Sequence, residues 1–255
     1  MNRIDQKLAN KNQVLSIYFT AGYPSLNDTK KIIIDLEQSG VDMIEIGLPF
    51  SDPLADGPVI QQSGTVALGN GMTTAVLFEQ LKDIRTDVKI PLLIMAYFNP
   101  ILQFGIENFC AKCAEIGIDG VIIPDLPIYV YEKEYKEIFE KYNIYNIFLI
   151  TPQTSELRIK YIDSISKGFI YMVSSNSTTG KKNNIADTTE AYFKRVANYN
   201  LKNPQLIGFG IHDKDSFQKS TQHQKGVIVG TDFIRFINEK GINDINEYSK
   251  KFRSF

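Results

Sequence analysis

The sequence has very few of the side chains that hold metals or form redox centres, with only two cysteines and two histidines among 255 residues. Cys110 and Cys113 form a single C-x-x-C in IENFCAKCAEIG. A structural zinc site needs a second such pair, and a redox motif normally opens a helix after a strand. Two histidines are also too few for a typical zinc site. Because Phe109, Cys113 and Ile116 recur at helical spacing, we predict that both thiols lie within an amphipathic helix as reduced cysteines.

Long apolar runs and a strong net charge are also absent. No run approaches the roughly 20 apolar residues that a membrane span needs. The formal net charge of −1 gives no reason to expect nucleic acid or an anionic membrane surface as a partner. The N-terminal stretch MNRIDQKLANKNQ is polar and lacks the apolar middle of a signal peptide. We therefore expect a soluble, cytoplasmic protein.

Short apolar runs alternate with longer amphipathic ones along the whole chain. The candidate strands are Val14–Phe19, Met43–Ile46, Leu92–Ala96, Gly120–Ile123, Ile144–Ile150, Phe169–Val173, Gln205–Ile207 and Val227–Val229. Continuous apolar runs are typical of parallel strands buried on both faces. Eight strand–helix units in this length predict an α/β fold, a (β/α)8 TIM barrel forming a single domain over residues 1–255. An open doubly wound sheet is the alternative. The stretch before Val14 is predicted to be a short helix that covers the barrel floor.

An acidic segment follows the second predicted strand, in EIGLPFSDPLADGP (residues 45–58). Catalytic residues of such barrels come from the carboxyl ends of the strands. Since Ile44 and Ile46 should face the helices, Glu45 should point into the barrel mouth, where burial raises a carboxyl pKa toward values useful for acid–base catalysis. The alternative is a buried salt-bridge partner. Asp56 lies on a loop long enough to fold back over the same mouth. Asp52 is interpreted as a structural turn residue.

Small residues recur in the loops after the last three predicted strands. Phosphate monoesters in these barrels bind near strands seven and eight, on backbone N–H groups and the N-terminus of a short helix. Glycine lets the backbone approach an anion closely. We therefore predict a phosphate site, with ordinary turn glycines as the alternative. Its candidate residues are Gly180, Gly210, Gly230 and Thr231.

Other chemistries lack the residues that they require. No predicted strand ends in lysine, so only the loop residues Lys181 and Lys182 remain as Schiff-base nucleophiles. Magnesium bound by the acidic segment together with Asp125 is disfavoured because the proline-rich loop is stiff, and Asp125 is equally suited to capping a helix. We predict metal-free general acid–base chemistry on an organic phosphate.

The stretch EIGLPFSDPLADGPVIQ, with YFTAGYP, MAYFNP, IPDLP, GFGI and IVGT in the same order, resembles the α subunit of tryptophan synthase from Ile17 to about Ile237. The resemblance implies retro-aldol cleavage of indole-3-glycerol phosphate to indole and glyceraldehyde 3-phosphate. By this resemblance Glu45 is the general acid–base that protonates indole C3 and takes the proton of the side-chain hydroxyl. Asp56 is the carboxylate that accepts a hydrogen bond from the indole N–H.

The resemblance also implies the remaining site residues and the partner. The implied substrate-binding residues are Phe19, Tyr97, Tyr171 and Thr179, and the implied phosphate-binding residues are Gly180, Gly210, Gly230 and Thr231. The family works as an αββα complex with a pyridoxal-phosphate β subunit, so no cofactor and no metal are expected in this chain. The loop carrying Asp52 and Asp56, and the segment Asn99–Phe104, would face that partner.

One loop departs from the family's usual sequence. YMVSSNSTTG has Ser175 where arginine is usual and Ser177 where glycine is usual, while Thr179 and Gly180 are retained. We expect this loop to close with altered stability and Thr179 to hydrogen-bond Asp56 when substrate is bound. Two other functions stay open: another phosphate-barrel enzyme of the isomerase or epimerase type, and a binding role that mainly activates a partner. Indole release, assayed with and without a β subunit, separates them.

Overall fold

A computed structural model describes residues 1–173, 182–208 and 210–252, and the backbone alone for 182–189. The strands form one sheet in which every pairing is parallel, in the order β5-β4-β3-β2-β1-β9-β8-β7-β6. They are β1 (Val14–Thr20), β2 (Met43–Gly47), β3 (Leu92–Met95), β4 (Gly120–Ile122), β5 (Tyr145–Ile147), β6 (Leu149–Ile150), β7 (Ile170–Val173), β8 (Gln205–Gly208) and β9 (Gly226–Val229).

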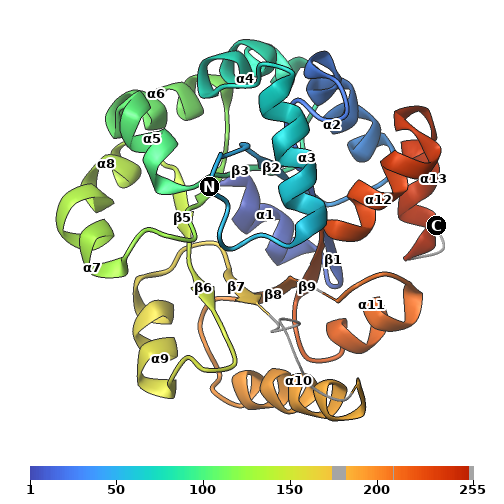
Figure 1. The fold of residues 1–255 in the computed structure, drawn as a ribbon. Coiled ribbons are helices and arrows are strands. Elements are labelled where there is room, and N and C mark those ends of the chain that lie inside the picture. Colours follow the sequence, from blue (N-terminus) through green and yellow to red (C-terminus); the bar gives the residue numbers. More distant parts are fainter. Residues whose placement is uncertain (174–181, 209, 253–255) are drawn as a thin grey trace.

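The sheet closes into a barrel through its fifth predicted strand. That segment is divided at Phe148 into β5, which pairs with β4, and β6, which pairs with β7. The two ends of the strand order are therefore consecutive in the chain. The strands form the central ring of Figure 1, with helices outside them. This arrangement is the predicted (β/α)8 barrel, and the open doubly wound alternative is wrong.

Helices follow the strands around the barrel (Figure 1). They are α1 (Arg3–Asn10), α2 (Thr29–Gln38), α3 (Pro58–Gly69), α4 (Thr74–Leu81), α5 (Phe98–Phe104), α6 (Ile106–Ile116), α7 (Ile128–Val130), α8 (Lys136–Lys141), α9 (Glu156–Ile165), α10 (Lys182–Ala197), α11 (Lys214–Thr221), α12 (Thr231–Lys240) and α13 (Ile245–Tyr248). Short 3-10 or π segments are η1 (Leu26–Asp28), η2 (Ile84–Thr86), η3 (Tyr131–Tyr135), η4 (Ile242–Asp244) and η5 (Ser249–Lys251). None of the described helices is long and apolar enough to cross a membrane.

Strand alternation divides the buried side chains into two cores. Ile17 and Phe19 of β1 belong to the larger core, between the strands and the surrounding helices. Val14 and Tyr18 belong to the smaller core inside the barrel. Successive side chains of a strand point to opposite faces, so each strand sends alternate residues into the barrel. This parity decides which residues reach the site at the carboxyl ends.

The N-terminal helix α1 covers the floor of the barrel, as predicted. Its side chains Ile4 and Leu8 belong to the core inside the barrel. Ion pairs hold its polar face: Arg3 contacts Asp119 at 2.9 Å and Lys11 contacts Asp42 at 3.0 Å. Because α1 covers the floor, we expect a substrate to enter at the opposite end, where the strands finish.

The two cysteines lie in α6, and both are buried free thiols. Burial raises the pKa of both thiols, Cys110 to about 12. A thiol with such a pKa stays protonated near neutral pH. The predicted position within an amphipathic helix is confirmed.

Candidate active site

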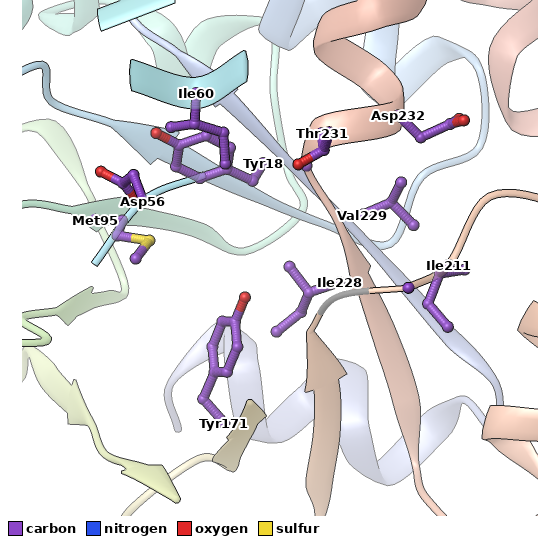
Figure 2. Close-up of a pocket in the computed structure, with 12 residues that line it drawn as sticks. Tyr18, Asp56, Ile60, Met95, Tyr171, Ile211, Ile228, Val229, Thr231 and Asp232 are labelled. Carbon is purple, nitrogen blue, oxygen red and sulfur yellow. The ribbon is translucent and has the colours of Figure 1, made fainter. Parts of the chain in front are cut away.

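A pocket opens at the carboxyl ends of the strands (Figure 2). Five predicted site residues line it, namely Asp56, Tyr171, Gly210, Gly230 and Thr231. The other lining residues are Tyr18, Ile60, Met95, Ile211, Ile228, Val229 and Asp232. Thr179 and Gly180 lie outside the described residues, as do Ser175, Ser177 and Lys181.

Glu45 lies in β2 and is fully buried; it does not line the pocket but interacts with the pocket residues Tyr18 and Tyr171. The Ser16 hydroxyl donates a hydrogen bond of 3.1 Å to Glu45 Oε1. The other oxygen, Oε2, has no hydrogen-bond partner in the part of the chain that the structure describes. Burial raises the pKa of Glu45 to about 8, and the bond from Ser16 opposes this rise. No cation is paired with it among the described residues, so the structure gives no support to the alternative of a buried salt bridge.

Asp56 lies on the loop between β2 and α3 and is partly buried. Burial raises the pKa of Asp56 to about 6, while a hydrogen bond from Tyr97 lowers it. The Tyr97 hydroxyl donates to Asp56 Oδ2 at 3.2 Å and accepts from the Ala55 N–H at 2.9 Å. Tyr97 also stacks on Phe50, with ring centroids 5.2 Å apart. Tyr97, which was predicted to bind substrate, is not among the residues that line the pocket, and it orients the Asp56 carboxylate instead.

Two tyrosines of the pocket lie near both carboxyl groups. Tyr18 and Tyr171 interact electrostatically with both Glu45 and Asp56, and both rings line the pocket (Figure 2). Each hydroxyl lies against a strand glycine: a Cβ on Gly47 or Gly208 would be 2.2 Å from it. Burial raises the pKa of both phenols, so they are neutral hydrogen-bonding groups at physiological pH.

Phe19 is a correction to the predicted site. It is fully buried in the core between strands and helices, outside the pocket, and its neighbour Tyr18 lines the pocket instead. The reason is strand parity, since Tyr18 pairs with Glu45 in the β1–β2 register. The signal was in the sequence, because Ser16, Tyr18 and Thr20 alternate with Leu15, Ile17 and Phe19.

Three of the four predicted phosphate residues, Gly210, Gly230 and Thr231, line the pocket after β8 and β9. Gly210 has a left-handed φ of 80°, which favours glycine. Gly230 precedes α12, and Thr231 begins that helix. The first N–H groups of a helix are free to bind an anion. Asp232 does not compete there, because its carboxylate accepts hydrogen bonds from Tyr248 and Lys251 and points away in Figure 2.

Two further carboxylates that the sequence singled out, Asp52 and Asp125, are not among the residues that line the pocket. Asp52 is exposed and accepts a hydrogen bond of 2.6 Å from Ser51. Asp125 accepts the Phe98 N–H at 2.8 Å and thereby caps the start of α5. Over the described residues, no three His, Cys, Asp or Glu side chains form a group able to hold a metal ion.

The fold and the pocket together define a class: a (β/α)8 barrel with two carboxyl groups of raised pKa at the carboxyl ends of its strands. The sequence model of the family described as tryptophan synthase alpha chain matches residues 4–254. The chain belongs to this family.

Curated relatives and solved structures resemble the whole chain. The tryptophan synthase alpha chain of Christiangramia forsetii is 62% identical over 254 residues, covering 100% of this chain and 99% of the relative. That of Flavobacterium johnsoniae is 62% identical over 253 residues, covering 99% and 100%. The crystal structure of tryptophan synthase subunit alpha from Legionella pneumophila has a TM-score of 0.84 at 33% identity, covering 99% and 92%. The tryptophan synthase complex from Pyrococcus furiosus matches with a TM-score of 0.83 at 33% identity, covering 94% and 96%.

Proposed function

We propose that this protein is a lyase that cleaves indole-3-glycerol phosphate to indole and glyceraldehyde 3-phosphate, the α reaction of L-tryptophan biosynthesis. The observation that carries the proposal is the difference in pKa between two carboxyl groups that both interact with the pocket tyrosines, about 8 for Glu45 and about 6 for Asp56. At pH 7 the first is mainly protonated and the second mainly ionised. Carboxyl groups whose pKa values are pushed apart in this way take separate acid and base roles.

In the proposed cleavage Glu45 acts first in its protonated form and Asp56 acts in its ionised form. Protonated Glu45 donates a proton to indole C3 and becomes a carboxylate, which then takes the proton of the side-chain hydroxyl. The C–C bond breaks, its electron pair returns to the ring and the hydroxyl carbon becomes the aldehyde. Ionised Asp56 accepts a hydrogen bond from the indole N–H and stabilises the positive charge that develops on the ring.

The rest of the pocket fits the two ends of such a substrate. Ile60, Met95 and Tyr171 offer apolar surface for an indole ring. Gly210, Gly230 and Thr231 offer backbone N–H groups for the phosphate. Thr179 and Gly180 are proposed to complete the site from the loop after β7.

The partner of this chain is proposed to be a tryptophan synthase β subunit, in an αββα complex in which the β subunit carries pyridoxal phosphate. Two apolar side chains support a contact surface where the family resemblance expects one: Leu54 is 95% exposed and Leu102 is 47% exposed. They lie on the loop of Asp52 and Asp56 and on the segment Asn99–Phe104. We also propose a single domain and a cytoplasmic location.

The proposal is tested by mixing the purified chain with indole-3-glycerol phosphate and following indole and glyceraldehyde 3-phosphate, alone and with a β subunit. We expect both products in equal amounts and faster release with the partner. An isomerised phosphate ester without indole would favour the isomerase alternative. Stimulation of the β subunit with no cleavage would favour the binding role.

A further inference from the structure

Ser16 contacts the Glu45 carboxyl group from inside the barrel. It lies in β1 two residues before Tyr18, which pairs with Glu45 in the β1–β2 register. Ser16 and Glu45 are both fully buried, and the Ser16 hydroxyl donates to Oε1 at 3.1 Å. In the described part of the chain Oε2 has no hydrogen-bond partner. The two oxygens of this carboxyl group are therefore in different environments.

This difference determines where the acidic proton lies. With a pKa of about 8, Glu45 is a carboxylic acid at neutral pH, with one carbonyl oxygen and one O–H. The Ser16 hydroxyl donates to Oε1, and the carbonyl oxygen is the better acceptor of the two oxygens of a carboxylic acid. The bond from Ser16 therefore assigns Oε1 as the carbonyl and Oε2 as the oxygen that carries the proton.

We propose that Ser16 is a positioning residue for the reaction, which fixes the Glu45 carboxyl group so that the transferable proton lies on Oε2, the oxygen to which Ser16 does not donate. This inference rests on the proposed function. In the first step the Oε2–H bond breaks and the proton passes to C3 of the indole ring. The Glu45 carboxylate that remains keeps the hydrogen bond from Ser16, which stabilises its charge until it takes the side-chain hydroxyl proton.

The other described groups that face Glu45 do not distinguish its two carboxyl oxygens by a hydrogen bond. Its register partner in β3 is Leu93, which is apolar. Tyr18 in β1 and Tyr171 in β7 are the titratable groups that interact with it, and burial raises the pKa of both. Both phenols thus stay neutral throughout the range in which Glu45 titrates. Ser16 is the group whose hydrogen bond distinguishes the two oxygens.

The test measures the Glu45 carboxyl group directly in the full chain. Infrared difference spectroscopy follows the C=O stretch of the protonated acid as pH is varied, and Glu45→Gln identifies the band by its loss. In Ser16→Ala we expect this band at higher frequency, because its oxygen no longer accepts a hydrogen bond. We also expect the titration midpoint to rise, by up to about one pH unit, since the hydrogen bond stabilises the charged carboxylate more than the neutral acid.

Two further variants separate the hydrogen bond from packing. Ser16→Cys keeps nearly the same size but has only a weak donor, so we expect it to behave as Ser16→Ala does. Ser16→Thr keeps the hydroxyl and should restore the parent band and midpoint. We expect kcat to fall in the alanine and cysteine variants with little change in KM. A parent-like band and midpoint in folded Ser16→Ala, or parent-like behaviour of Ser16→Cys, would overturn the inference. Loss of the proposed function would appear separately, as absence of indole release by the parent protein, and would leave the spectroscopic result standing.

Discussion

Glu45 and Asp56 are eleven residues apart in the chain and differ in how much water each retains. Glu45 is fully buried and its pKa is raised to about 8, whereas Asp56 is partly buried and its pKa is raised to about 6. Desolvation disfavours the charged form of a carboxyl group. The separation of the two pKa values therefore follows from depth in the barrel, and it has consequences for stability as well as for catalysis.

The raised pKa of Glu45 makes the protein less stable as pH rises. Between its ordinary value of 4.5 and its folded value of about 8, the unfolded chain has released a proton that the folded protein retains. The free energy of unfolding should fall across that interval, by up to about 1.4 kcal/mol per pH unit from this group. Glu45→Gln removes this component, so urea denaturation across the interval should show a shallower fall for the variant. Parallel curves for the two proteins would contradict the raised pKa.

The hydrogen bond from Tyr97 to Asp56 should determine the pH at which kcat/KM falls on the acid side. Tyr97→Phe removes a donor to the ionised carboxylate but keeps the ring that stacks on Phe50. The pKa of Asp56 should rise, because a bond that favoured its charged form is lost. We expect the acid limb of kcat/KM to move to higher pH in this variant. Tyr142→Phe, which alters an exposed hydroxyl near Glu107, is the control, and an equal shift in both variants would contradict this role for Tyr97.

Among the individual residues, the sequence predicted the carboxyl groups of Glu45 and Asp56. It missed two side chains that lie near Glu45, namely Ser16 and Tyr18. Glu45 was found because Ile44 and Ile46 flank it, so its direction followed from parity. The inward direction of Ser16 and Tyr18 was present in the alternation along β1, but their position beside Glu45 required the register between β1 and β2. That register depends on strand pairing across 27 residues, which the local pattern of β1 does not contain.

Among the elements, the loops after β8 and β9 carry the proposed phosphate site, and glycine is the feature to test. A ligand that binds only the native state adds about 2.7 kcal/mol to the free energy of unfolding at 100 times its Kd, and the melting temperature rises as a result. Gly210→Val should abolish the rise caused by inorganic phosphate, since the side chain fills the space of the anion. Gly241→Val is a matched control. The φ of Gly241, 79°, is close to the 80° of Gly210, and a Cβ added at Gly241 would meet no neighbour. A phosphate response retained in Gly210→Val would place the anion elsewhere.

The floor of the barrel offers a test that should leave catalysis intact. Asp119 is buried and accepts bonds from Arg85 at 2.6 Å and Arg3 at 2.9 Å. Asp119→Ala leaves the mostly buried Arg85 without its carboxylate, and should lower the free energy of unfolding by about 3–5 kcal/mol. Arg3→Ala removes a partly exposed partner and should cost only about 0–1 kcal/mol. Urea denaturation checks both values, and equal losses would contradict the assignment of Asp119 to the buried pair with Arg85.

The elements themselves were predicted well, because apolar runs and amphipathic periodicity are local features of the sequence. The division of the fifth strand was not predicted. The run from Ile144 to Ile150 is continuously apolar except at Asn146, and nothing within it marks Phe148 as the point of change. The break appears only where pairing with β4 gives way to pairing with β7, a property of barrel closure.

For the whole molecule, closure is what brings residues from distant parts of the chain together. The floor is covered by α1, and the pocket at the opposite end collects side chains from β1, β7 and the loops after β2, β8 and β9 (Figures 1 and 2). Family membership follows from matches along the entire chain. The role of each residue in the proposed reaction depends on Glu45 acting as the proton donor and acceptor.

The most direct measurement is therefore indole release from indole-3-glycerol phosphate by Glu45→Gln, in the presence of a β subunit. Glutamine keeps the shape of the side chain but cannot exchange the proton, so kcat should fall by about 10² to 10⁴ while phosphate still raises the melting temperature. Glu156→Gln, which alters an exposed carboxylate paired with Lys160, is the control and should keep the parent rate. Near-normal indole release by folded Glu45→Gln would contradict the account.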